Sequence, residues 1–304
     1  MRECVDDDTV RILRREDAEY PALLRPVPTA PASLHMRGRL VVGDALAVAL
    51  VGSRRATPYG LAVAETMAAD LAARGVTIVS GLARGVDSAA HRGALRVGGR
   101  TIAVLGSGVD SIYPPENRRL ADEIAAHGAL LSQFPLGAPP LPQNFPTRNA
   151  VIAGLSLAVV VIEAAERSGS LITARLAAEL GREVLAVPGR VTAPESRGAN
   201  RLIQDGAALA LGWEDVVAAL PDRWRTCIDT AARMTSAATG PGEDEGEPNR
   251  TVLSLLGEDP VDIDRVIERS GLGAARVSAA LLDLELDGRV RQIEGKRFVR
   301  VALG

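Results

Sequence analysis

Short apolar runs alternate with longer amphipathic stretches between about residues 44 and 217. Runs such as 47–51 and 157–162 are almost wholly apolar, which is typical of strands covered on both faces of a sheet. The pattern predicts strands at 46–51, 76–80, 100–105, 129–134, 157–163 and 183–187, and helices at 59–73, 87–97, 117–127, 147–155, 170–180 and 199–205. This alternation predicts an α/β fold built on a right-handed, doubly wound, mainly parallel sheet.

The distribution of polar residues divides the rest of the chain into three parts. Residues 1–43 carry four prolines and predict an extended segment packed on the core, ending in a short strand near 34–36. The α/β domain is assigned to 44–221, and 222–248 is expected to be a linker because it becomes acidic and rich in Gly and Pro. Residues 249–304 form a second unit.

The pattern of residues 249–304 predicts a winged helix. Its pattern gives helices at 249–257, 261–269 and 274–287, followed by a hairpin that turns at Glu294-Gly295. The third helix carries Arg276 against three acidic residues, Asp283, Glu285 and Asp287, which would repel the phosphates beside a major groove. Protein contact or packing is therefore the favoured role. Basic residues in the hairpin keep a DNA role open: Arg289, Arg291, Lys296, Arg297 and Arg300.

Composition narrows the class of protein. The 304 residues are 47% hydrophobic but only 3% aromatic, and the formal net charge of −3 means that any nucleic-acid contact depends on local clusters. Cys4 and Cys227 lie far apart and form neither a disulfide framework nor a metal motif. The acidic N-terminus lacks a signal peptide and the apolar runs are too short to cross a bilayer, so we expect a cytoplasmic protein without membrane contact.

Three predicted strands end in loops of Gly, Ser and Arg. The loops are Val51-Gly52-Ser53-Arg54, Ser80-Gly81-Leu82-Ala83-Arg84-Gly85 and Leu105-Gly106-Ser107-Gly108. Carboxyl ends of parallel strands share one edge, glycine admits close backbone approach, helix N-termini favour anions and arginine binds phosphate. Three such loops predict an extended phosphate-binding surface.

Two further loops suit the same surface. Arg148 and Asn149 open a helix, and Ser168, Gly169 and Ser170 precede another. The predicted phosphate-binding residues are Gly52, Ser53, Arg54, Arg55, Gly81, Arg84, Gly106, Ser107, Gly108, Arg148, Asn149, Ser168, Gly169, Ser170 and Thr173.

The familiar nucleotide and metal motifs are missing from the sequence. The Gly106 loop fails G-x-G-x-x-G, and the single lysine, Lys296, is not in a Walker sequence. The three histidines have no ligand-spaced neighbours, so no metal or other cofactor is expected. Acid catalysis by Glu163 and Glu166 is disfavoured, since no nucleophile–base pair accompanies them. No catalytic residue is assigned.

Together these strings resemble the DNA-processing protein A (DprA, or Smf) family. The matching runs include Val51–Arg54 with Pro58-Tyr59-Gly60, Ser80–Asp87 with Ala90–Leu95, and Thr101–Gly106 with Tyr113-Pro114. Others are Phe145-Pro146-x-Arg148-Asn149, Ile152–Ser156, Ser168–Ala174 and Ala186–Gly189. Their common order makes the resemblance far more specific than any one loop.

The resemblance implies a Rossmann-like domain that binds single-stranded DNA without a chemical step. It also implies a homodimer that protects incoming DNA and loads the RecA recombinase during natural transformation. The family usually has a basic residue where this chain has Ala150, so one phosphate contact is missing or comes from another arginine, with Arg118, Arg119 and Arg175 as candidates.

Two other functions remain open. Nucleotide phosphoribohydrolases of the "lysine decarboxylase" type resemble the chain in fold, but they carry Pro-Gly-Gly-x-Gly-Thr-x-x-Glu where this chain has Arg167-Ser-Gly-Ser-Leu-Ile-Thr173. A transcription regulator acting through the winged helix is opposed by the acidic third helix.

Overall fold

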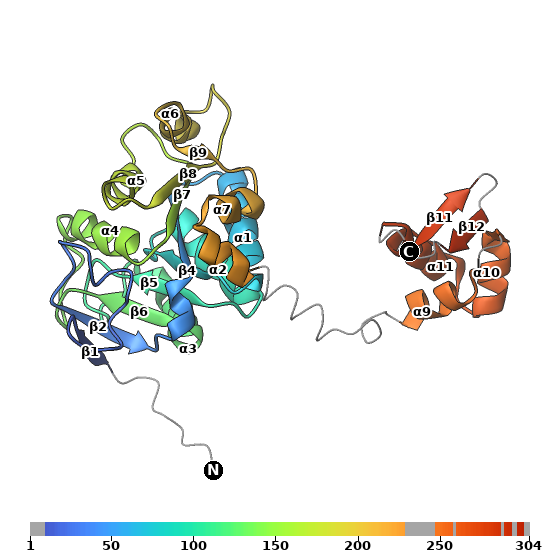
Figure 1. The fold of residues 1–304 in the computed structure, drawn as a ribbon, viewed down its shortest axis with the longest axis horizontal. Helices are drawn as coiled ribbons and strands as arrows, with labels where there is room; N and C mark the ends of the chain where they lie inside the picture. Colours follow the sequence, from blue (N-terminus) through green and yellow to red (C-terminus); the bar gives the residue numbers. More distant parts are fainter. Residues whose placement is uncertain (1–9, 229–246, 258–259, 287–288, 294–296, 301–304) are drawn as a thin grey trace, which may run out of the picture. The chain divides into compact units, whose positions relative to one another are not determined.

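The computed structural model describes residues 10–228, 247–257, 260–286, 289–293 and 297–300. The chain divides into two compact units, 1–233 and 234–304 (Figure 1). Among the described residues, no helix has the length and apolarity needed to span a membrane.

A nine-stranded sheet forms the centre of the first unit, in the order β1-β2-β6-β5-β4-β3-β7-β8-β9. Its strands are β1 (Arg11–Arg14), β2 (Ser33–Gly38), β3 (Ala47–Gly52), β4 (Thr77–Ser80), β5 (Thr101–Val104), β6 (Ala129–Ser132), β7 (Ala158–Ile162), β8 (Glu183–Ala186) and β9 (Ala208–Leu209). Strands β3 to β9 pair in parallel, whereas β1 and β2 are antiparallel additions at one edge. The doubly wound, mainly parallel sheet is therefore confirmed.

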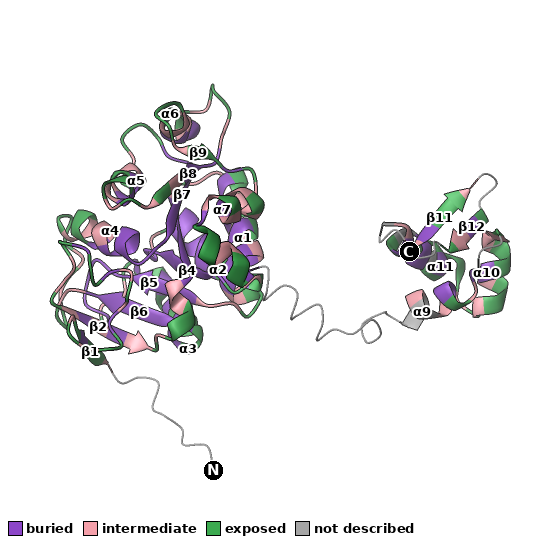
Figure 2. Cartoon of the chain, in the orientation of Figure 1, coloured by how far each residue is buried: buried purple, intermediate pink, exposed green. Residues whose placement is uncertain are grey.

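Helices cover both faces of this sheet. They are α1 (Pro58–Ala73), α2 (Val86–Arg96), α3 (Arg118–His127), α4 (Asn144–Gly154), α5 (Ser170–Glu179), α6 (Arg197–Gln204) and α7 (Trp213–Ala219). Helices α4, α5 and α6 pack on the face that carries Ala49 and Val51, while α1, α2 and α7 pack on the face of Val48 and Leu50. Both faces of the central strands are consequently buried, as Figure 2 shows, which explains their uninterrupted apolar sequences.

Helix α4 begins at Asn144, three residues before the predicted start at 147. Pro146 therefore lies in the first helical turn, where proline is tolerated because its missing N–H would have no helical partner. This earlier start places Phe145 on the helix.

The segment before β3 adds two strands to the sheet, of which the sequence predicted only β2. Tyr20, Leu24 and Leu34 are buried against the core, so the segment is an integral layer of the domain.

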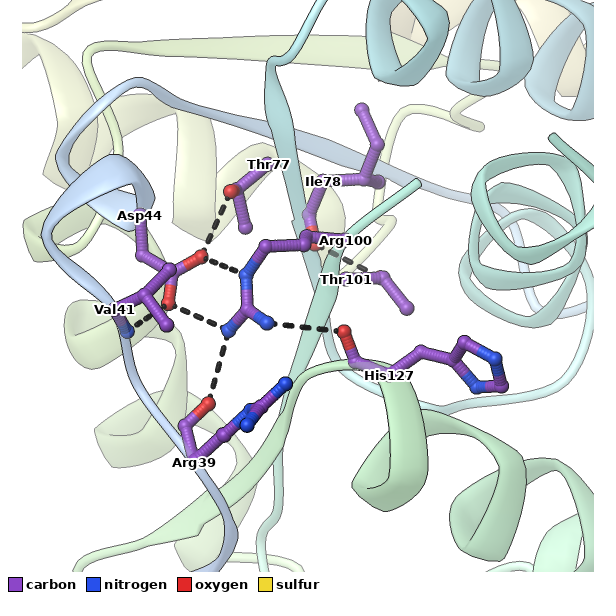
Figure 3. Close-up of polar contacts among 8 residues, drawn as sticks. All are labelled: Arg39, Val41, Asp44, Thr77, Ile78, Arg100, Thr101 and His127. Atoms are coloured by element: carbon purple, nitrogen blue, oxygen red, sulfur yellow. Dashed lines mark hydrogen bonds and ion pairs between the residues drawn. The ribbon is translucent and has the colours of Figure 1, made fainter. Parts of the chain in front are cut away.

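An ion pair joins this segment to the amino ends of the strands (Figure 3). The Asp44 carboxylate accepts from Nε and Nη2 of Arg100 at 2.7 and 2.8 Å, and from the Thr77 hydroxyl at 2.9 Å. Arg100 also donates to the carbonyls of Arg39 and His127. The network fixes residues 39–44 to β4, β5 and the end of α3.

The first unit extends beyond residue 221, where composition had placed the start of the linker. Residues 222–228 are helical, and Trp224 and Ile228 pack on the core beneath α1 and α7. Residues 229–246 of the expected linker lie outside the described residues, and its last two residues, 247–248, belong to α9.

The second unit is a winged helix. It comprises α9 (Glu247–Ser254), β10 (Val261–Asp262), α10 (Ile263–Ser270), α11 (Ala274–Leu286), β11 (Val290–Ile293) and β12 (Arg297–Arg300), with strand order β10-β12-β11. Val266, Leu281 and Phe298 lie in its apolar core. The three helices and the hairpin agree with the sequence prediction, whereas β10 was not predicted, and the turn at 294–295 lies outside the described residues.

Candidate nucleic-acid interface

The site lies where the winding of the sheet reverses. From β3 the chain enters α1 on one face, and from the neighbouring β7 it enters α5 on the other. Such a switch point leaves a crevice at the carboxyl ends of the strands. A groove of about 470 Å³ occupies this position and is lined by residues of the loops after β3, β4 and β7 and of the start of α4.

The first Gly-Ser-Arg loop packs tightly against β7. A Cβ at Gly52 would overlap the carbonyl oxygen of Ile162, and the amide of Ser53 donates to the Glu163 carbonyl at 2.8 Å. The guanidinium of Arg54, by contrast, is exposed and lies 4.8 Å from the centre of the Phe145 ring. Arg54 and Arg55 both line the groove.

A carboxylate already covers the N-terminus of α1. Glu163 follows β7 with a φ of 48° and is buried, and its Oε2 accepts from the amide of Thr57 at 2.8 Å. Its Oε1 accepts from the Thr57 hydroxyl, and a Cβ at Gly60 would overlap the same carboxylate. The sequence predicted that a helix start after such a loop favours phosphate. The N-terminus of α1 is instead occupied by the carboxylate of Glu163, and the positive charge in this part of the groove comes from Arg54 and Arg55.

Gly81 connects the second loop to two buried charged residues. Its amide donates to Oδ2 of Asp87 at 3.1 Å, and its carbonyl accepts from Nη1 of Arg148 at 2.6 Å. Burial raises the pKa of Asp87, an effect that the nearby Arg148 opposes. The next residue, Leu82, has a φ of 57°, a conformation that persists only where the surroundings hold it.

Arg148 is buried, and most of its donors are engaged within the protein. Nη1 also donates to the Val104 carbonyl at 2.5 Å, and Nε donates to Oδ1 of Asn149 at 3.1 Å. Burial lowers the pKa of Arg148 to about 10, with Asp87 opposing and Arg54 adding to that effect. Arg148 lines the groove, but its geometry is that of a residue that holds β4, β5 and the Gly81 loop together.

The third loop lies beside the groove. Gly106 and Ser107 line a smaller pocket of about 30 Å³ together with Tyr113, but Ser107 is buried and its hydroxyl donates to the Ser111 carbonyl at 2.6 Å. The amide of Gly108 donates to the Ala138 carbonyl. This loop therefore offers the pocket backbone surface, while the Ser107 hydroxyl and the Gly108 amide have partners in the protein.

Arg84 also lines the smaller pocket, at its exposed rim. Its Nε donates to Oε1 of Glu116 at 2.5 Å. That hydrogen bond raises the pKa of Arg84, with a smaller contribution from Tyr113.

The loop before α5 forms the opposite wall of the groove. Ser168, Gly169, Ser170 and Thr173 all line it, with the hydroxyls of Ser168 and Ser170 2.8 Å apart. Asn149 donates to the Gly169 carbonyl at 3.4 Å and so links this wall to α4.

Sequence analysis missed two residues of this site. Arg167 is exposed and lines the groove, and Phe145 lines both the groove and the smaller pocket. Arg167 directly precedes the predicted Ser168, and Phe145 lies three residues before the predicted Arg148, so nearness in sequence was the available signal. Three arginines were candidates to replace the basic residue that is missing at position 150. Arg119 pairs with Glu123, and Arg175 pairs with Glu179. Neither these two nor Arg118 is among the lining residues of the groove.

The groove carries an excess of positive charge. Four arginines line it, namely Arg54, Arg55, Arg148 and Arg167, against one carboxylate, that of Asp87. Within the described ranges, no cluster of His, Cys, Asp and Glu is suited to a metal. His91 is buried with its Nδ1 2.6 Å from the Thr101 hydroxyl, and burial lowers its pKa to about 3.

The fold and the groove are those of a Rossmann-like α/β protein with an arginine-lined crevice at the switch point of its sheet. Residues 11–221 match the family described as DNA recombination-mediator protein A, and residues 236–296 match the DprA winged helix domain. The chain is 42% identical over 277 residues to protein Smf of Escherichia coli, which covers 91% of this chain and 74% of that protein. It is 45% identical over 199 residues to DNA processing protein DprA of Streptococcus pneumoniae, covering 66% and 70%. The chain therefore belongs to the DprA/Smf family.

Solved structures agree with this assignment. The X-ray structure of DprA from S. pneumoniae superposes with a TM-score of 0.67 at 42% identity, covering 71% of this chain and 76% of that one. DNA processing protein A from Helicobacter pylori gives a TM-score of 0.62 at 31% identity, covering 74% and 97%, and its structure was described for a single-stranded DNA binding mode.

Proposed function

We propose that this protein binds single-stranded DNA non-covalently in the groove between β3 and β7. The supporting observation is that three exposed arginines, Arg54, Arg55 and Arg167, line one groove at the switch point of the sheet. Guanidinium groups bind phosphate oxygens bidentately, and the serine-rich wall before α5 provides hydroxyl donors. The H. pylori relative, described for single-stranded DNA binding, has the same fold.

Phe145 adds a surface for a base. Its ring is half-buried between the groove and the smaller pocket and has Arg54 above it. Bases stack on exposed aromatic rings regardless of sequence, which is the usual basis of sequence-tolerant binding to single strands. A duplex keeps its bases paired and stacked and cannot use such a ring.

Family membership supports a biological setting for this binding. We infer that the protein acts in the cytoplasm, where it protects incoming single strands and loads RecA during natural transformation. We also infer a homodimer. The apolar surface beside β9 supports it, because Leu209 is 44% and Leu211 76% exposed, and exposed apolar patches mark surfaces that contact another protein. Leu211→Glu should shift the mass measured by light scattering from dimer to monomer, and an unchanged mass would reject this surface.

Arg54→Ala tests the site itself. Each phosphate contact on a single strand contributes about 0.7 to the slope of log K against log salt, so the variant should bind all sequences more weakly with a slope flatter by about that amount. Arg175→Ala is the matched control, since Arg175 is exposed on α5, pairs with Glu179 and is not among the groove residues. Fluorescence anisotropy with single- and double-stranded oligonucleotides at two salt concentrations measures both quantities. An unchanged slope would remove Arg54 from the site.

We infer that no chemical step takes place in this groove. Glu163, one of the two carboxylates considered for catalysis, accepts hydrogen bonds from Thr57 through both of its oxygens. Release of free base from a nucleoside monophosphate would instead support the phosphoribohydrolase alternative. Sequence-specific duplex binding by the full chain, lost when Arg291 of the winged helix is replaced by Ala, would support a transcription regulator.

A further inference from the structure

We propose that Tyr113 forms a second stacking position for a nucleobase, next to Phe145, so that the strand continues from the groove across the ends of β4 and β5. This inference rests on the proposed function. It extends the site to the smaller pocket, which is lined by Gly81, Gly106, Tyr113 and Phe145 together with the arginines at positions 54 and 84.

The two rings form one continuous surface. The centroids of Tyr113 and Phe145 lie 6.1 Å apart with the ring planes tilted by 52°. Neighbouring bases of a duplex strand are about 3.4 Å apart along the axis, so two bases that each stack on one ring must be separated from each other. Only a single strand can open its bases in this way, and the pair of rings thus adds to the selection against duplex.

Each ring has its own cation. Arg54 lies over Phe145, and Arg84 lines the same pocket and interacts with Tyr113, which helps to raise the pKa of Arg84. A nucleic acid strand alternates base and phosphate, and an alternation of aromatic and guanidinium groups matches that sequence. Tyr113 is also 39% exposed, so its ring is accessible to a partner.

The cation beside Tyr113 is held by an exchangeable partner. Arg84 pairs with Glu116, and the two side chains are 57% and 52% exposed. An exposed ion pair of this kind contributes little stability and is readily replaced. A phosphate reaching Tyr113 would take the place of Glu116.

Replacement of Tyr113 tests the stacking position. Tyr113→Leu keeps an apolar side chain against Phe145 but removes the ring, and Tyr113→Phe keeps the ring. Binding of oligo-dT is measured by fluorescence anisotropy as a function of length. We expect Tyr113→Leu to weaken binding at least about fivefold for oligonucleotides that reach both rings, with no effect on the shortest that binds, and Tyr113→Phe to behave as the parent.

Two results would overturn the inference. Equal affinity of Tyr113→Leu and the parent at every length would show that the ring is not used. Equal weakening at every length would show that Tyr113 only supports Phe145. In either case Arg54→Ala would still weaken binding if the groove binds DNA, so failure of the second position is distinguishable from failure of the proposed function.

Glu116→Gln provides an independent test of the same path. Loss of the carboxylate should leave Arg84 free for phosphate and tighten binding of the longer oligonucleotides about twofold. The control is Glu123→Gln, which breaks the corresponding pair with Arg119 on α3. Identical affinities for the two variants would contradict a phosphate at Arg84.

Discussion

The guanidinium of Arg148 lies 2.6 Å from the carbonyl oxygen of Gly81, and that contact joins α4 to the loop after β4. A second carbonyl, that of Val104, accepts from the same nitrogen. We infer from these contacts that Arg148 positions the groove, whereas the sequence predicted a phosphate contact for it, as it did for Arg54.

Arg148→Ala should destabilise the first unit by about 3 kcal/mol, since it leaves two buried carbonyls unpaired and Asp87 without its nearby cation. Arg54→Ala should leave stability unchanged because its side chain is exposed. Thermal unfolding followed by circular dichroism should show a melting temperature lower by about 10 °C for the first variant alone. Equal melting temperatures would contradict the positioning role.

Gly81→Ala should weaken both stability and DNA binding. A Cβ at this position would overlap the Arg148 guanidinium, which cannot move without losing its carbonyl partners, and overpacking of this kind costs about 1–3 kcal/mol. Gly169→Ala is the matched control in the same groove, as nothing lies within 4 Å of its added Cβ. Denaturant unfolding of both variants measures the difference, and comparable losses would refute the argument.

His91 should make stability sensitive to acid. Burial lowers its folded pKa to about 3, below the usual value of about 6.5, so the unfolded chain binds the proton first as pH falls. The stability is fully present above pH 6.5 and is lost progressively between there and pH 3. From pH 7.5 to pH 5 this group should cost about 2 kcal/mol.

His91→Asn isolates that contribution, because all other groups are common to both proteins. The variant is less stable at neutral pH, but the difference in free energy of unfolding should shrink by the stated amount as the pH is lowered to 5. A constant difference across this range would mean that the pKa of His91 is the same in the folded and the unfolded protein.

Asp44→Asn should release the segment before β3. The carboxylate is only 7% exposed and pairs with Arg100, which is 26% exposed, and breaking a largely buried pair by removing one charge costs about 3 kcal/mol. Glu19→Gln breaks the exposed pair with Arg11 in the same segment and should change stability by less than about 0.5 kcal/mol. Urea unfolding compares them, and similar midpoints would contradict the assigned role.

Most of the central sheet could be predicted from the sequence because each strand is buried on both faces and each helix on one. Strand β9 could not, since it has only two residues and both are exposed, so the burial that marks the other parallel strands is missing. Strand β1 has one buried residue, Leu13, among exposed neighbours, and its pairing with β2 gives it strand geometry.

The loops were predicted as a group, but the role of each residue was not. Local sequence identified Arg54 and Arg148 as similar, and the difference between them arises from Gly81, 67 positions away from Arg148 in the chain. The same holds for Glu163 and Thr57, separated by 106 positions. Contacts of this kind depend on the fold and leave no mark in a short motif.

The carboxylate of Glu163 has a consequence for ligand choice. In dinucleotide-binding domains with this type of sheet, the pyrophosphate rests against the amides that begin the first helix. In this protein the carboxylate of Glu163, which follows β7, already accepts from the Thr57 amide, so a deeply seated diphosphate would meet repulsion. Anions are directed outward to the exposed arginines of the groove, Arg54, Arg55 and Arg167. There a polymer can pass along the edge of the sheet without being enclosed.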